Sequence, residues 1–194
     1  MKKGSGLRIY AILYLLFLYA PVFLLPIFAF NSGTVIAFPL QGFTLDWFGR
    51  MVGNESLRMA VSNSLLIAVC ASVISTSLGI FAARASTRYI FPLKGGIVGF
   101  IMLPLVMPEI ILAVALLVVM LGIGIPLGLF TVIVGHVLIC TPFTIAILNG
   151  AFMSLDKSLE EAAYDLGETR ISTFRLIILP LVAPKFLAAD AFFI

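Results

Sequence analysis

Long stretches without charge are the feature that most constrains this chain. Residues 9–45 and 59–83 contain no Asp, Glu, Lys or Arg, and residues 95–155 contain only Glu109. A helix needs about 20 apolar residues to cross the hydrocarbon of a bilayer, so the first two stretches fit one span each and the third fits two. The composition agrees, because 62% of the residues are hydrophobic and 11% are charged. An ordinary soluble domain is therefore excluded.

Four transmembrane helices are predicted in a single transmembrane domain that covers residues 1–194. They lie at about residues 9–30, 60–83, 97–121 and 129–150. Helices are favoured over strands because lipid offers no partner for unpaired backbone groups, and because these runs lack the alternation of a membrane barrel. The fold class is all-α and polytopic. Pro104 and Pro108 in the third span and Pro142 in the fourth are expected to bend their helices.

The basic residues predict the orientation of the spans. Lys and Arg beside short loops are retained on the cytoplasmic side of a membrane. With the N-terminus inside, ten of the twelve basic residues lie inside, and only Arg50 and Arg58 lie outside. The ten are Lys2, Lys3, Arg8, Arg84, Arg88, Lys94, Lys157, Arg170, Arg175 and Lys185. We therefore expect a cytoplasmic N-terminus and a cytoplasmic stretch from about residue 151 to 185.

The external loop after the first span contains several glycines and one proline, Pro39, and predicts a short amphipathic helix near Leu45 to Met51. Trp47 and Phe48 in that helix are expected to lie at the membrane interface. The second span has small residues from Ala68 to Ala83 at helical spacing, which lets another helix approach closely. That neighbour is either another helix of this chain or a helix of a partner permease.

Glu109 is the one acidic residue predicted inside the membrane, and it follows Pro108 directly. An intramembrane carboxylate is costly, so it suggests a function such as a cation site or a gate. The alternative is a structural carboxylate that is neutral or bonded near the backbone carbonyls left free by Pro108.

The stretch from about 154 to 180 reads as helix, break, helix in the cytoplasm. Ser158 and Glu161 have the spacing of a capping box at a helix start. Ala162 and Ala163 give a compact apolar face, and Gly167 allows the left-handed backbone that ends such a helix. A short two-faced helix that projects from a membrane bundle suits docking into a groove on a cytoplasmic protein.

The same stretch resembles the complete EAA loop of binding-protein-dependent ABC importer permeases. The match consists of Glu161, Ala162 and Ala163, then Gly167 after three residues, Ile177 after nine more, and Leu179 with Pro180. Within that family the chain is most similar to the spermidine/putrescine importer permeases, at Phe30-Asn31-Ser32, Gly42-Phe43-Thr44, Trp47, Asn63-Ser64 and Pro108-Glu109. In those permeases an acidic residue after the third-span proline is similar to Glu109.

The resemblance implies a type I ABC importer permease in the bacterial cytoplasmic (inner) membrane. Its expected partners are a cytoplasmic dimer of ATP-binding subunits, a second permease, an extracytoplasmic solute-binding protein and membrane lipid. It implies no cofactor, no nucleic acid and no ATP hydrolysis by this chain, which has no Gly-rich phosphate loop. The implied coupling residues are Glu161, Ala162, Ala163 and Gly167, with Ile177, Leu179 and Pro180 as anchors of the loop. Pro108 and Glu109 belong to the implied solute pathway.

The family continues through two further spans after the proline of the loop. Here a fifth span is expected to begin at about residue 186, and the chain ends at Ile194. Nine helical residues after Lys185 cover roughly 13 Å, which is under half of the hydrocarbon thickness. The sequence thus predicts four complete spans and the start of a fifth, with the C-terminal part missing.

Three other functions stay open at this stage. A permease for another solute, such as iron, phosphonate or thiamine, would share the EAA loop. A membrane scaffold would use the same cytoplasmic helix only to bind a partner. An intramembrane enzyme is disfavoured, because one histidine and the lack of a His-Glu-x-x-His or Gly-x-Ser-x-Gly pattern leave no catalytic set.

Overall fold

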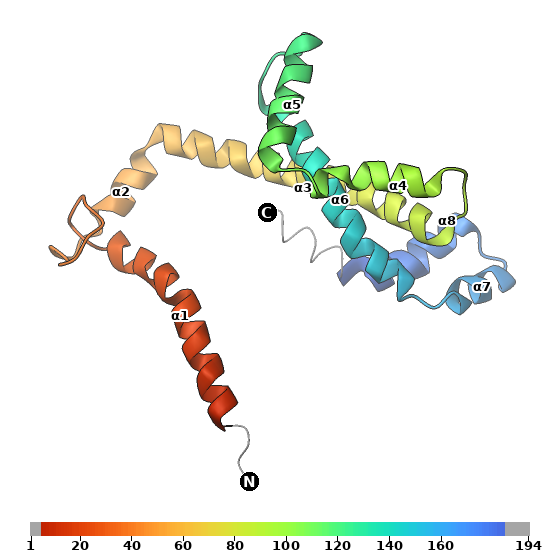
Figure 1. Ribbon diagram of the computed structural model, residues 1–194, viewed down its shortest axis with the longest axis horizontal. Helices are drawn as coiled ribbons and strands as arrows, with labels where there is room; N and C mark the ends of the chain where they lie inside the picture. The colour runs from red at the N-terminus through yellow and green to blue at the C-terminus, as the bar shows by residue number, and fades with distance from the viewer. Residues whose placement is uncertain (1–4, 185–194) are drawn as a thin grey trace. The chain divides into compact units, whose positions relative to one another are not determined.

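The computed structural model describes residues 5–184, and its regular elements there are helical (Figure 1). An antiparallel bridge joins Asn31 to Phe43. The chain forms two compact units, Met1–Ala60 and Val61–Ile194. The all-α class predicted from the sequence is confirmed for the described residues. The fifth span expected from about residue 186 lies outside them.

The first unit contains helix α1 (Ser5–Ala29), a loop, and helix α2 (Asp46–Gly53). Helix α1 covers the first predicted span, and its large apolar side chains are exposed over its whole length. Such an apolar surface requires lipid or other helices around it. Helix α2 confirms the short helix predicted near residues 45–51.

Helix α3 (Glu55–Arg88) begins in the first unit and continues through the second. At 34 residues it is about 51 Å long, well beyond the roughly 30 Å of bilayer hydrocarbon. Helix α6 (Leu129–Met153) runs through Pro142 as one helix and covers the fourth predicted span. With α1, these are the three helices that are long and apolar enough to cross a membrane by themselves, among the residues described.

The small-residue face of α3 packs against α6. Ser72, Ser75, Gly79 and Ala83 are buried within the chain, and Ala68 is half-buried. A Cβ atom built on Gly79 would lie 2.4 Å from the Thr144 Cγ2 atom of α6. Of the two neighbours considered for this face, a helix of the same chain is therefore confirmed.

The third predicted span is not one continuous helix. It consists of α4 (Lys94–Met102), a 3₁₀ turn η1 (Leu103–Leu105) and α5 (Glu109–Gly122), seen in green in Figure 1. The two arms are bent by 104°. The bend expected from Pro104 and Pro108 is present, and it is a complete break. By length and composition the pair fits one broken span or a re-entrant loop, so the span over 97–121 stays a prediction. Two prolines four residues apart remove two backbone donors and disfavour helix at the residue before each, so the chain breaks completely.

The segment after α6 folds back onto the bundle. It comprises α7 (Ser158–Asp165), α8 (Arg170–Thr173) and a π-helical turn η2 (Phe174–Ile178), followed by α-helix to the end of the described residues. Ile178 and Val182 of this segment join the buried core made by Ala83 of α3 and the α6 residues Ile145, Leu148, Ala151 and Phe152. The core therefore sits where α3, α6 and the segment after α8 meet.

Candidate functional site

Helix α7 is the centre of the candidate site, and Asp156 fixes where it starts. The Ser158 backbone N–H donates to Asp156 Oδ1 at 3.0 Å. The pKa of Asp156 is lowered because its carboxylate accepts hydrogen bonds from the backbone and side chain of Ser158. The capping box predicted for Ser158 and Glu161 is wrong, because Ser158 is already the first helical residue and Asp156 supplies the acceptor. A carboxylate there also suits the helix dipole.

Gly167 ends α7, as the sequence predicts. Its φ is +86°, in the left-handed region that favours glycine. The Gly167 N–H donates to the Tyr164 carbonyl at 2.9 Å, and the Glu168 N–H donates to the Ala163 carbonyl at 3.0 Å. This pair of bonds is a Schellman motif, which uses the last free carbonyls of the helix and turns the chain sharply.

A charge cluster of Arg84, Arg88 and Glu160 joins α7 to the end of α3. Arg84 Nη2 donates to Glu160 Oε2 at 2.9 Å, and Arg88 Nε lies 3.0 Å from Glu160 Oε1. The second contact is an ion pair without the alignment of a hydrogen bond. The arginine side chains are 10% exposed and that of Glu160 is 13% exposed. At this burial the ion pairs are screened far less than surface pairs.

Both arginines reach further into the segment that surrounds α7. Arg88 Nη2 donates to the Leu155 carbonyl at 3.0 Å, just before α7. The guanidinium carbon of Arg84 lies 5.1 Å from the centre of the Phe174 ring in η2, a cation–π contact. Arg84 Nη1 is buried without a hydrogen bond. The end of α3 is thus bonded to both sides of the helical segment that the family resemblance assigns to coupling.

The predicted coupling residues lie on different faces of this segment. Glu161 and Ala162 are exposed, while Ala163 is 3% exposed and faces the bundle. Ile177 and Leu179 are half-buried and Pro180 is exposed. The neighbouring residue Ile178 is the one that enters the core. Helix α7 therefore has one face on the bundle and another, with Glu161 and Ala162, open to a partner.

Pro180 explains the π-helical turn that precedes it. A proline has no N–H, and its ring would collide with the carbonyl four residues earlier in an α-helix. The wider turn Phe174–Ile178, closed by a bond from the Leu179 N–H to the Phe174 carbonyl, relieves that collision. This turn also presents Phe174 to Arg84.

The structure places Glu109 far along the chain from the coupling segment, at the first position of α5. Pro108 is the residue that precedes the helix, and its carbonyl already accepts from the Ile111 N–H at 2.9 Å. Glu109 is exposed, and within residues 5–184 no hydrogen bond or ion pair holds its carboxylate. The alternative of a structural carboxylate bonded to the carbonyls near Pro108 thus finds no bond to support it.

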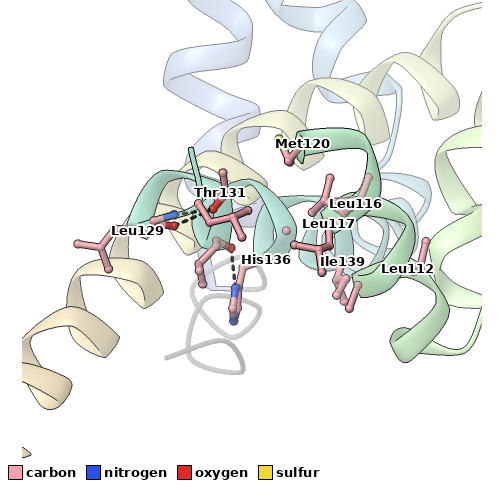
Figure 2. A pocket seen from close by; sticks show the side chains of 14 residues that line it. Leu112, Leu116, Leu117, Met120, Leu129, Thr131, His136 and Ile139 are labelled. Atoms are coloured by element: carbon pink, nitrogen blue, oxygen red, sulfur yellow. Dashed lines mark hydrogen bonds between the residues drawn. The ribbon is translucent and has the colours of Figure 1, made fainter. Parts of the chain in front are cut away.

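A separate groove of about 730 Å³ lies between α5 and α6 (Figure 2). Its lining is apolar apart from Thr131 and His136. Thr131 Oγ1 bonds to the Gly128 backbone, and His136 Nδ1 lies 2.8 Å from the Val132 carbonyl of its own helix. Glu109 is not among the lining residues. The groove therefore suits apolar packing and offers no carboxylate to a cationic solute.

Sequence reasoning missed Arg84, Arg88, Phe174 and Glu160 as members of the site. Arg84 and Arg88 counted only as charges that flank a span, and Glu160 counted only as a first-turn acid. The signal available in the sequence was weak, because Glu160 is 76 residues from Arg84 and nothing local connects them. Two arginines one helical turn apart at the end of a span, as in Arg84 and Arg88, were the only hint.

Comparison with known proteins gives the same family as the resemblance of the EAA loop. Residues 75–191 match the family described as binding-protein-dependent transport system inner membrane component. The chain is 34% identical over 184 residues to the spermidine/putrescine transport system permease protein PotC of Escherichia coli K12, covering 95% of this chain and 67% of the relative. It is 35% identical over 179 residues to the putrescine transport system permease protein PotI of the same organism, covering 89% and 63%.

Two further matches are proteins named for the uptake of saccharides. The diacetylchitobiose uptake system permease protein DasC of Streptomyces coelicolor is 33% identical over 154 residues, covering 77% of this chain and 54% of the relative. A crystal structure of a bacterial ABC transporter involved in the import of the acidic polysaccharide alginate superposes with a TM-score of 0.70 at 19% identity. That match covers 94% of this chain and 68% of the solved one, and it shows the fold.

Proposed function

Because this chain belongs to the family of binding-protein-dependent transport system inner membrane components, we propose that it forms part of the pathway for a polyamine such as spermidine or putrescine. The relatives PotC and PotI are named for these solutes. DasC, at similar identity over a shorter stretch, is named for a disaccharide. Identity alone therefore does not select the solute, and the argument for a polycation depends on Glu109.

The proposed orientation places the N-terminus and the loop 154–180 in the cytoplasm. Its support is the distribution of Lys and Arg, ten inside against two outside. Under this topology α7 faces the compartment that contains ATP, and α5 and α6 meet at the outer surface. Hydrolysis of ATP would belong to partner subunits, and this chain would transmit their movement.

The observation that most supports coupling is how α7 is held. One face of α7 is open, its end is turned by Gly167, and Glu160 ties it to α3 through two ion pairs. A partner that moves α7 must therefore move α3 and the core as well, since packed helices shift as rigid elements. In this mechanism Glu161 and Ala162 dock with the ATPase, Ala163 packs α7 against the bundle, and Ile177, Leu179 and Pro180 connect the loop to the next helix.

Replacing Gly167 by Ala tests whether α7 couples or only binds. An L-residue in the left-handed region costs about 1–2 kcal/mol, a factor of about 5–30 in the population of the turned segment. We expect ATPase activity stimulated by the loaded binding protein to fall about tenfold while the ATPase subunits still co-purify. Gly167→Asn is the control, because Asn tolerates this backbone conformation and should retain most of the activity.

Replacing Glu109 by Gln tests the solute pathway. A hydrogen bond to a charged group contributes about 1.5–3 kcal/mol, so its loss should slow spermidine uptake by roughly tenfold or more. Glu109→Asp should keep part of the rate. Glu55→Gln is the matched control, because Glu55 is also an exposed first-turn carboxylate, at the start of α3, and should leave uptake unchanged.

The decisive experiment is solute-stimulated ATP hydrolysis by the importer reconstituted in vesicles from the full-length components. Stimulation by polyamine-loaded binding protein, weakened by Glu109→Gln, supports the proposal. Stimulation by iron, phosphonate or thiamine but not by polyamines would keep coupling and remove the role of Glu109. A scaffold would bind the ATPase subunits yet show no stimulation by any solute.

A further inference from the structure

The loop between α1 and α2 folds back onto the end of α1. Phe38 meets Phe28 of α1 edge to face, with ring centres 5.1 Å apart. Phe43 stacks on Phe30 at 5.3 Å, and Phe30 also meets Phe48 of α2 at 5.3 Å. These contacts place the loop and the first turn of α2 beside the last turn of α1.

Hydrogen bonds of Asn31 hold the loop against the end of α1. It is 3% exposed, its side-chain oxygen accepts from the Gln41 N–H at 2.9 Å, and its backbone carbonyl accepts from Trp47 Nε1 at 2.8 Å. The Ser32 N–H donates to the Gly42 carbonyl, and the Thr44 N–H donates to the Phe30 carbonyl. The loop is therefore a fixed part of the first unit, and its depth in the membrane follows that of α1.

The length of α1 sets that depth. Its 25 residues span about 38 Å, which is less than the roughly 40–45 Å of a bilayer with its headgroups. A helix of this length centred on the bilayer ends inside the headgroup layer, which places its last turn, with Phe28, there. Because Phe38 packs against Phe28, the loop lies at the same level and does not project far into water.

The exposed side chains of the loop suit the headgroup layer. Residues 31–45 contain no charged side chain. Val35, Ile36 and Phe38 are 67%, 80% and 65% exposed. Charges appear only in α2, where Arg50 lies over the Trp47 ring at 5.0 Å and Asp46 opens the helix. An apolar tip, an indole and a flanking cation make up the pattern of an interfacial anchor.

We propose that residues 31–53 form a lipid anchor in which Val35, Ile36 and Phe38 enter the headgroup and acyl boundary at the end of α1, so that this surface binds lipid and not the solute-binding protein. The anchor goes beyond transport itself and holds whether or not the solute is a polyamine. Its physical role is to fix the height and tilt of α1 in the bilayer.

The test measures the depth of a spin label attached to the loop in the full importer in vesicles. Cys70 and Cys140 are first replaced by Ser, and a nitroxide is attached to Ile36→Cys, Val35→Cys, Phe17→Cys or Gly49→Cys. Phe17, in the middle of α1, is the lipid reference and is 80% exposed. Gly49 lies next to Arg50 and about one helical turn from Asp46, on the charged side of α2, which is expected to face water. It has open space around it and is the control.

We expect collisions with oxygen to exceed collisions with a water-soluble nickel chelate at residues 35 and 36, as at residue 17, with an oxygen-to-nickel ratio several-fold above that at residue 49. Adding the loaded binding protein should leave these ratios unchanged. A ratio at residues 35 and 36 equal to that at 49 would overturn the anchor. So would nickel collisions that drop when the binding protein is added, because that surface would then be a protein interface.

Discussion

Replacing Glu160 by Gln is expected to release α7 from α3 and reduce solute uptake by tenfold or more. Glu160 is the only acid in the charge cluster with Arg84 and Arg88, and the three side chains are nearly buried. Removing one partner of a buried ion pair costs about 3–5 kcal/mol, because the other charge is left uncompensated. Here two guanidinium groups would be left facing each other. Uptake per ATP hydrolysed in vesicles is the measurement.

Glu168→Gln is the control for this variant, because Glu168 is an exposed acid of the same segment outside the cluster. A double-mutant cycle makes the test specific. If Glu160 acts through Arg84, the pair Arg84→Gln and Glu160→Gln should lose less than the sum of the single losses. Wild-type uptake in Glu160→Gln, or simple addition of the two effects, would show that the cluster has no part in coupling.

Gly79→Val is the second variant for which a large effect is expected, and it acts on packing. A Cβ atom at residue 79 would lie 2.4 Å from Thr144 Cγ2 and 2.8 Å from Thr144 Cβ. Overpacking usually costs about 1–3 kcal/mol, and a valine should reach at least the upper end, because the buried Thr144 side chain occupies the space that its Cβ atom needs. We expect α3 and α6 to separate, seen as a loss of thermal stability in detergent by size-exclusion chromatography.

The matched control is Gly150→Val on α6, where nothing lies within 4 Å of the added Cβ atom. That variant should stay close to wild type. Thr144→Ser removes the closest atom, so it should recover part of the stability lost by Gly79→Val. Equal destabilisation by Gly79→Val and Gly150→Val would mean that the close approach of α3 and α6 does not determine stability.

Together these variants separate two roles of α3. Gly79 lies in the packed middle of the helix, where a side chain should unfold the bundle. Arg84 and Arg88 lie at its end, where a charge change should leave the bundle folded and alter transmission. A variant importer that assembles normally but hydrolyses ATP without transport would therefore have lost the transmission of movement through the end of α3.

The sequence by itself determined the features that depend on near neighbours along the chain. Charge-free stretches predicted helices where α1, α3 and α6 lie, because a span is defined by about 20 consecutive apolar residues. Gly167 was predicted to end α7, because a left-handed residue is a local requirement. The short helix α2 and the small-residue face of α3 were also predicted from local spacing, but only the structure showed that the neighbour of this face is α6.

Only the tertiary structure decided features that join distant segments or that depend on competing local choices. Asp156 accepts the first N–H of α7, because the helix begins at Ser158, one residue earlier than a capping box with Ser158 as N-cap would require. The break before Glu109 comes from two prolines acting together, and the 104° angle between its arms was not predicted from the spacing of those prolines. Glu160 meets Arg84 because α6 returns the chain to the end of α3. The ion pair joins residues that are 76 positions apart in the chain, and no periodic pattern in the sequence predicts such a contact.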